Sequence, residues 1–284
     1  MVKILAALIL TLSAGLALAT DSGREKRLGE MLSASATLTG EAVWLDAGAD
    51  KFLGLYTAQT TRTLQGGAII LHDTGMNPDW PAVIAPLRRE LPKRGWSTLA
   101  VQLPLPGEAK EDNSALLDQI PARIKAAIAF LHTKDITRIV LIGHGQGATL
   151  GATFLANDPQ SGIGALIGIG MSAEKNQEPR LYLPTALEKI SLPILDIYGS
   201  RDEDSSRTRA ERRNAAVKAS ASTPPQQTGA PPKRPGNALQ YRQIEIPGTD
   251  HLFTASDIIL VKRITGWLKK YAATAPSSTQ PAKP

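Results

Sequence analysis

The sequence of 284 residues contains no cysteine, which excludes two kinds of stabilisation. No disulfide can form and no thiolate can bind zinc, so the fold must rest on its hydrophobic core. Beyond the first residues, no apolar run approaches the roughly 20 residues that a membrane-spanning helix needs. Aromatic side chains are scarce, at 5% of the chain, and they do not alternate with basic ones as in nucleic-acid binders. We therefore expect no stable membrane span and no nucleic-acid partner.

The one long apolar run stands at the N-terminus. Lys3 precedes the apolar residues 4–16, and the small-residue sequence Ala17-Leu18-Ala19 follows them. This pattern is typical of a cleaved secretory signal, so residues 1–19 are predicted to be a signal peptide, with an uncleaved anchor as the alternative. Export of a chain without cysteine favours the periplasm.

Composition divides the rest of the chain into one domain and three polar segments. Residues 20–40 are expected to be an N-terminal linker and residues 41–272 a single folded domain. Residues 222–238 are rich in proline, glycine and glutamine, which predicts a flexible insertion in that domain. Residues 273–284 have the same character and are expected to be a disordered tail.

Hydrophobic patterning predicts an α/β fold. Two β-like runs at 42–45 and 52–58 flank a turn with Gly48, which indicates an antiparallel hairpin. Beyond them, short apolar runs alternate with helical patterns, as in a doubly wound, mostly parallel sheet. The expected strands of that sheet are 68–71, 97–101, 138–142, 163–169, 193–198 and 241–246.

Helices are expected at 116–131, 207–220 and 255–271. Pro121 lies inside the first, where it predicts a kink or a later helix start. The net charge of +6 is spread thinly except for arginines at 201–213. These arginines are interpreted as a solvated helix face, and an anionic partner is the alternative.

The strand at 138–142 leads into Gly143-His144-Gly145-Gln146-Gly147 and then into a helix. This is the order of a nucleophile elbow, in which the outer glycines allow a strained turn and the central residue stands above the sheet. Here the centre is Gly145, which has no side chain to attack an acyl carbon. Thr149 and Ser172 are the nearest hydroxyls, but neither stands at the apex of the elbow.

Asp202 follows the strand at 193–198 and His251 follows the strand at 241–246, so elbow, acid and histidine occur in that order. With these residues the chain from about 42 to 271 resembles the α/β-hydrolase superfamily, and it is most similar to an uncharacterised exported bacterial branch with a Gly-His-Gly-Gln-Gly elbow. The resemblance implies that Asp202 orients His251 as general base. Glu203 or Asp204 is the alternative acid.

The resemblance also implies an oxyanion hole. The N–H of Gln146 would be one donor, and the second would come from the segment of His72, Asp73 and Thr74. Asp73 departs from the family, where a small residue commonly follows the histidine. A carboxylate aimed at the hole would oppose an oxyanion about 4 Å away by roughly 4 kcal/mol at an effective dielectric near 20, whereas one facing solvent would leave its N–H free. Trp80 either caps a ligand or packs its own loop onto the domain.

His72, His144 and His251 all follow predicted strands, at the sheet edge where α/β proteins bind ligands. A metal site is the minor alternative, and the prediction is no metal and no cofactor, with His72 and His144 as packing residues.

Together these features predict an exported hydrolase-fold protein without the nucleophilic serine: a pseudo-hydrolase or a binding protein for a small acyl or lipid-like ligand. The alternative is a hydrolase or lyase in which His251 and Asp202 activate water or abstract a proton. A third hypothesis is an interaction protein that uses the arginines at 207–213.

Overall fold

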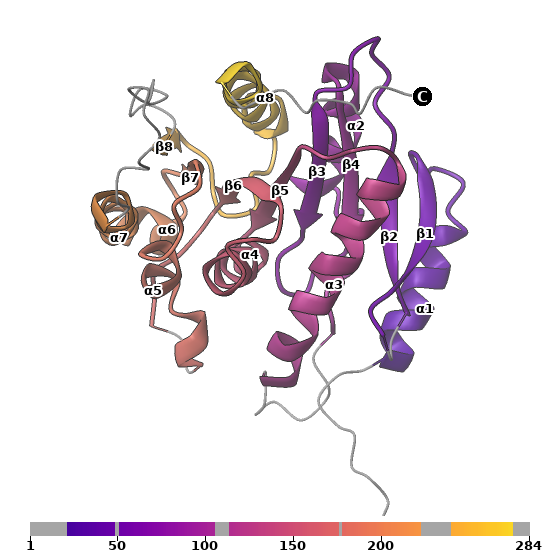
Figure 1. Cartoon of the computed structure of the whole chain (residues 1–284), viewed down its shortest axis with the longest axis horizontal. Helices are drawn as coiled ribbons and strands as arrows, with labels where there is room; N and C mark the ends of the chain where they lie inside the picture. The colour runs from indigo at the N-terminus through magenta and orange to yellow at the C-terminus, as the bar shows by residue number, and fades with distance from the viewer. Residues whose placement is uncertain (1–21, 49–50, 106–113, 176–177, 223–239, 275–284) are drawn as a thin grey trace, which may run out of the picture.

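A mostly parallel sheet with helices on both faces organises the chain (Figure 1). The computed structural model describes residues 22–48, 51–105, 114–175, 178–222 and 240–274. In this part of the chain the sheet has eight strands in the order β1-β2-β4-β3-β5-β6-β7-β8. The predicted fold class is therefore confirmed.

The sheet begins with the predicted antiparallel hairpin, β1 (Glu41–Asp46) and β2 (Lys51–Thr57). β2 also pairs antiparallel with β4, and the remaining strand pairs are parallel. Strands β3, β4 and β5 are buried along their whole length, which explains why their sequences are apolar runs without alternation. The other strands are β3 (Gly66–Leu71), β4 (Trp96–Val101), β5 (Ile139–His144), β6 (Ile163–Ile169), β7 (Ile194–Gly199) and β8 (Tyr241–Ile246).

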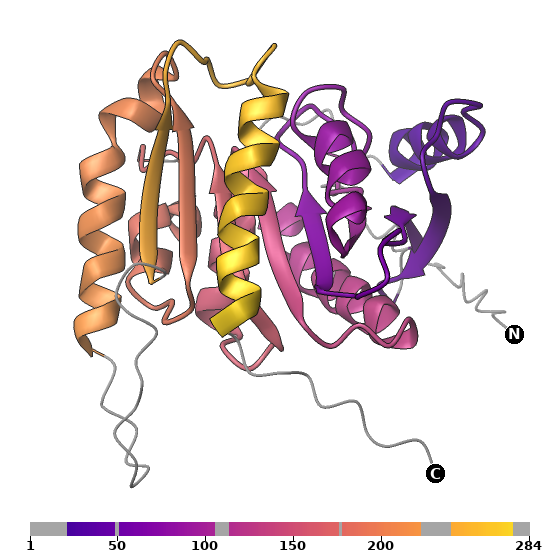
Figure 2. The ribbon, with the colours of Figure 1, turned by 90° about the horizontal axis from the view of Figure 1, so that it is seen from above.

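Helices cover the two faces of the sheet and close two separate apolar cores (Figure 2). One core lies beneath α2 (Ile84–Glu90) and α8 (Asp257–Thr274). The other lies beneath α3 (Ser114–Thr133), α4 (Gln146–Asn157) and α5 (Leu183–Leu187). Pro121 lies inside α3, which already begins at Ser114, so the later helix start is wrong.

The segment expected to be a linker contains a helix, α1 (Ser22–Ser33). Glu25 of α1 forms an ion pair with Arg123 of α3 at 2.5 Å, and both side chains are buried. Gly29 lets α1 approach the sheet, because a Cβ there would lie 2.7 Å from the Trp44 ring. The linker prediction is therefore wrong for these residues: they are attached to the domain by a buried charge pair that local composition does not reveal.

The helix expected at 207–220 corresponds to α7 (Arg209–Ser222), and a separate short helix, α6 (Glu203–Arg207), precedes it. Arg212 of α7 is fully buried, and its guanidinium binds the buried carboxylate of Asp196 at 2.8 Å. The arginine-rich segment is therefore not a uniformly solvated face, since Arg212 is a structural residue.

None of the described helices combines the length and the apolarity needed to cross a membrane. The expected signal peptide lies outside the described residues, as do most of the predicted insertion at 222–238 and most of the predicted tail at 273–284.

Candidate active site at the strand ends

The glycine-rich segment forms a sharp turn between β5 and α4. Gly145 has φ 52° and ψ −119°, a left-handed conformation that side chains strain to adopt. A Cβ on Gly143 would lie 2.3 Å from the Cα of Ala148, and a Cβ on Gly147 would lie 2.3 Å from the carbonyl oxygen of His72. The segment is therefore a sharp strand-to-helix turn without room for a Cβ at either outer glycine, and we call it the elbow.

The carboxylate of Asp73 fills the space above this turn. Asp73 follows β3 and the elbow follows the adjacent strand β5. The chain leaves β3 toward β4 and leaves β5 toward β6, so both segments lie at the point where the strand order reverses, which is a common ligand site in such sheets. A Cβ built on Gly145 would lie 2.2 Å from Cγ of Asp73 and 2.3 and 2.4 Å from its two oxygens. Asp73 thus occupies the position that a nucleophile at residue 145 would take.

Three hydrogen bonds hold that carboxylate. Its Oδ1 accepts from the backbone N–H groups of Gln146 and Thr74, each at 2.7 Å. Its Oδ2 lies 2.8 Å from Nε2 of His251. The side chain is only 14% exposed, so the interpretation in which Asp73 faces solvent is wrong. The N–H of Gln146, the expected oxyanion donor, already binds an anion.

His251 lies between two carboxylates. Its Nδ1 is 2.8 Å from Oδ2 of Asp202, a buried residue whose Oδ1 also caps α6 by accepting from the N–H of Ser205. Asp202 is therefore the partner in this structure, while Glu203 and Asp204 are exposed.

These contacts change the charge state of the site. The hydrogen bonds that His251 donates to the carboxylates of Asp202 and Asp73 raise the pKa of its ring to about 10, so the ring is an imidazolium at neutral pH. Burial alone would raise the pKa of Asp73, but hydrogen bonds from His251, Gln146 and Thr74 hold it below its ordinary value. A protonated His251 cannot act as a general base, and the ionised Asp73 is its stable counter-ion.

His72 and His144 support the site from beneath. His72 donates from Nδ1 to the backbone oxygen of Asp73 at 2.8 Å and accepts from the N–H of Leu103 at 3.1 Å, and burial lowers its pKa to about 4. His144 donates from Nε2 to the backbone oxygen of His251 at 2.9 Å, and its ring stacks on that of His251. Both rings fix loop geometry, as packing residues do.

Asp73, His144 and His251 are also the described residues that could converge on a metal, with possible ligand atoms within 4.8 Å of one another. Oδ2 of Asp73 and Nε2 of His251 already bind each other, and Nε2 of His144 binds a carbonyl. Hydrogen bonds thus engage one possible ligand atom of each residue, while Nδ1 of His144 is buried without a hydrogen-bond partner among the described residues.

A cavity of about 300 Å³ opens beside Gly145. Its walls include Thr149 and Ser172, the two hydroxyl residues that the sequence places nearest to the glycine-rich turn. His72 and Trp80, also expected at the site, do not line it. Trp80 packs against the core beneath α2 and α8, so it does not cap this cavity. Thr74 contributes its N–H to Asp73, and its hydroxyl donates to the Gln146 side chain. The walls are Asp73, Gly145, Gln146, Thr149, Gly170, Ser172, Glu174, Lys175, Leu181 and His251.

Sequence reasoning missed Gly170, Glu174, Lys175 and Leu181. Glu174 and Lys175 lie beyond the carboxyl end of β6. This position in the sequence could have identified them, because ligands bind at the carboxyl edge of a parallel sheet. Leu181 ends a short 3₁₀ helix whose position the sequence does not reveal.

Comparison with known proteins agrees with this architecture. A family model described as "Protein of unknown function (DUF3530)" matches residues 20–115 and 105–270. No curated protein matches the chain.

Several solved structures share the fold. Est1E from Butyrivibrio proteoclasticus has a TM-score of 0.60 at 15% identity, covering 81% of this chain and 99% of its own. A serine hydrolase without lid from Xanthomonas campestris has a TM-score of 0.58 at 15% identity, covering 84% and 97%. Dienelactone hydrolase from Anabaena variabilis has a TM-score of 0.58 at 20% identity, covering 80% and 95%. Likeness at these identities establishes the α/β-hydrolase fold and no activity.

Proposed function

Because the chain belongs to the DUF3530 family and has the α/β-hydrolase fold, we propose that it is a pseudo-hydrolase of the cell envelope that binds a small acyl or lipid-like ligand without cleaving it. One observation carries the proposal: the carboxylate of Asp73 stands where a nucleophile at residue 145 would stand. The envelope location rests on the signal-like pattern of residues 1–19, and N-terminal sequencing of the mature protein tests it by the expected start at Thr20.

Three requirements of acyl transfer are unmet in this arrangement. Gly145 offers no nucleophile, the N–H of Gln146 is engaged by an anion, and His251 is protonated. A developing oxyanion about 4 Å from Asp73 would be opposed by roughly 4 kcal/mol, which corresponds to about a thousandfold in rate. The cavity of about 300 Å³ persists beside the elbow and has the concave shape that a small ligand needs.

Turnover of esters and thioesters of increasing chain length tests this proposal. The wild type is expected to be silent, and so is Gly145→Ser, because its Cβ would collide with Asp73. The double variant Asp73→Gly/Gly145→Ser removes the obstacle and restores the nucleophile, so it should gain turnover that a further His251→Ala abolishes. Wild-type turnover that depends on His251 would show that the protein is an enzyme. Failure to bind any acyl compound or envelope lipid would contradict the binding function.

A second candidate function is hydrolysis with Asp73 as the nucleophile. It is favoured because the two carboxylate oxygens of Asp73 have different hydrogen-bond partners. Oδ1 accepts from two backbone N–H groups, while Oδ2 faces His251. In this mechanism Oδ2 attacks a saturated carbon, the leaving group departs with its electron pair, and an alkyl ester forms on Asp73. Esterification removes one of the two carboxylates that raise the pKa of His251, so that ring can then lose its proton and activate water. Water attacks the ester carbonyl at the two N–H donors, and the alcohol leaves.

Mass spectrometry separates the two candidates. If Asp73 is a nucleophile, His251→Ala incubated with an alkyl halide or an epoxide should carry a stable adduct on Asp73. A single turnover of the wild type in ¹⁸O-water should then place the label in the Asp73 carboxylate. An unlabelled, unmodified Asp73 in both experiments eliminates this second candidate and leaves the pseudo-hydrolase proposal standing.

A further inference from the structure

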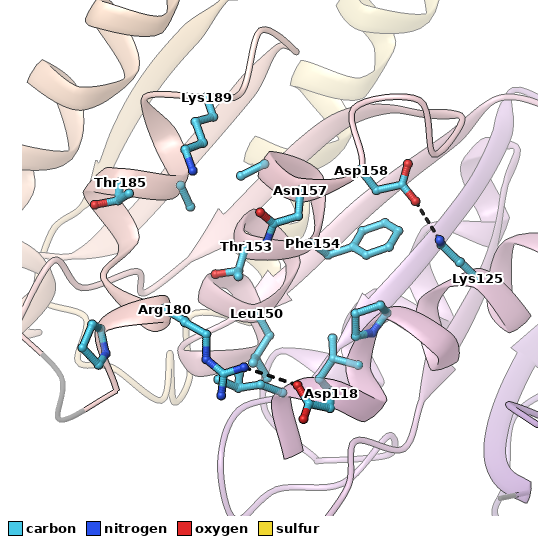
Figure 3. A pocket seen from close by; sticks show the side chains of 16 residues that line it. Asp118, Lys125, Leu150, Thr153, Phe154, Asn157, Asp158, Arg180, Thr185 and Lys189 are labelled. Atoms are coloured by element: carbon cyan, nitrogen blue, oxygen red, sulfur yellow. Dashed lines mark hydrogen bonds and ion pairs between the residues drawn. The ribbon is translucent and has the colours of Figure 1, made fainter. Parts of the chain in front are cut away.

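A second and larger cavity, of about 550 Å³, lies on the face of the sheet opposite α8. It is bounded by α3, α4 and the chain from the 3₁₀ helix η2 (Pro179–Leu181) to the end of α5 (Figure 3). Among the described residues, it shares no wall residue with the cavity at the elbow. We call it the α3–α4–α5 groove.

The floor of the groove is apolar. Leu150 and Phe154 are four residues apart on α4 and therefore lie on one face of that helix. Leu117 and Ile120 of α3 line one side, and Ala186 of α5 lines the other. An aliphatic chain placed on this floor would exchange water contact for contact with these side chains.

The rim of the groove is charged and unevenly neutralised. Two ion pairs span it, Arg180 with Asp118 at 3.3 Å and Lys125 with Asp158 at 3.0 Å. Each carboxylate on the rim therefore already has a cation. Lys189 forms no ion pair with any described residue, and Figure 3 shows its side chain extending along the α5 wall beside Thr185. Arg180 also pairs with Glu178 at 3.0 Å, so Lys189 is the described rim cation without a carboxylate partner, and an anionic head group would supply one.

We propose that the α3–α4–α5 groove binds a single-chain amphiphile with an anionic head group. The chain lies over Leu150 and Phe154, and the head group pairs with Lys189. A volume of about 550 Å³ falls within the roughly 300–1,000 Å³ of small-molecule sites. This site goes beyond the elbow site of the proposed function.

Calorimetric titration with dodecanoate below its micelle concentration tests the groove. Lys189→Glu should weaken binding by about tenfold or more, because a charge-assisted contact becomes a repulsion. Thr185→Trp should abolish binding, because Thr185 is exposed on the groove wall and a bulky ring there fills the groove without entering the core. Lys262→Glu on α8 makes the same charge change on the far face and should leave affinity unchanged. Dodecyltrimethylammonium, with the opposite head-group charge, should bind at least about tenfold more weakly than dodecanoate.

Three results would overturn the proposal: no dodecanoate binding by the wild type, unchanged affinity in both groove variants, or equal binding of the cationic amphiphile. Binding that is lost in Lys175→Glu, in the wall of the elbow cavity, but kept in Lys189→Glu and Thr185→Trp would place the ligand at the elbow. That outcome refutes the groove and supports the proposed function. A thermal unfolding curve for each variant verifies that lost binding does not reflect lost folding.

Discussion

Substitution of Gly145 by alanine should strongly lower the free energy of unfolding only when Asp73 is present. The new Cβ would lie 2.2 Å from Cγ of Asp73, whereas carbon atoms in contact are about 3.5–4.0 Å apart. The carboxylate must therefore move by more than about 1 Å, which breaks its contacts with Gln146, Thr74 and His251.

The magnitude follows from three separate terms. A positive φ of 52° costs alanine about 1–2 kcal/mol in any background. Overpacking adds about 1–3 kcal/mol, and the loss of even one charge-assisted hydrogen bond adds about 1.5–3 kcal/mol. Gly145→Ala should therefore lower the free energy of unfolding by about 3.5–8 kcal/mol in the wild type but by only about 1–2 kcal/mol in Asp73→Gly.

Urea unfolding of the four proteins in this double-mutant cycle measures the coupling. Gly162→Ala is the matched control, because Gly162 has φ 84° and a Cβ there would meet nothing within 4 Å. It isolates the cost of the backbone conformation. If Gly145→Ala lowers the free energy of unfolding equally with and without Asp73, the carboxylate does not occupy the space above Gly145 and the reasoning fails.

Three further predictions concern the rest of the domain and its pH dependence. Arg212→Met leaves the buried Asp196 without its cation and should lower the free energy of unfolding in urea by about 3–5 kcal/mol. The exposed Arg213→Met should lower it little, and equal decreases for the two variants would refute the buried ion pair. Glu25→Ala leaves Arg123 without its carboxylate and should speed proteolysis within α1, while Glu30→Ala, at an exposed site of the same helix, should not. The raised pKa of His251 contributes stability that is fully present below pH 6.5 and is lost as pH rises through about 10. The urea midpoint of the wild type should therefore fall across that window, and a fall of the same size in Asp73→Asn would contradict the contribution of Asp73.

The sequence predicted the parts of the site that depend on local pattern. The glycines around Gly145 indicated a sharp turn, and Asp202 and His251 were found because each follows a strand of a parallel sheet. The direction of the Asp73 side chain was not predictable, because His251, which holds it, lies 178 residues away in the chain.

The errors in the predicted fold have the same origin, a contact between residues that are far apart in the chain. The helix α1 has a polar sequence, and the partner that secures it to the domain, Arg123, is 98 residues from Glu25. Arg212 was interpreted as part of an exposed arginine cluster, although its partner Asp196 lies on a buried strand. In each case a charged side chain is buried through a distant partner, and composition within a short window carries no signal of that.

The protonation state of His251 tests the central claim most directly, because only a carboxylate at the elbow gives the ring a second anionic partner. NMR titration of the ring nitrogens should find the wild-type imidazole protonated well above pH 6.5, with a pKa near 10. The same titration of Asp73→Asn should give a distinctly lower pKa. A wild-type ring that titrates near 6.5, with no change in Asp73→Asn, would contradict the assignment of Asp73 to the nucleophile position.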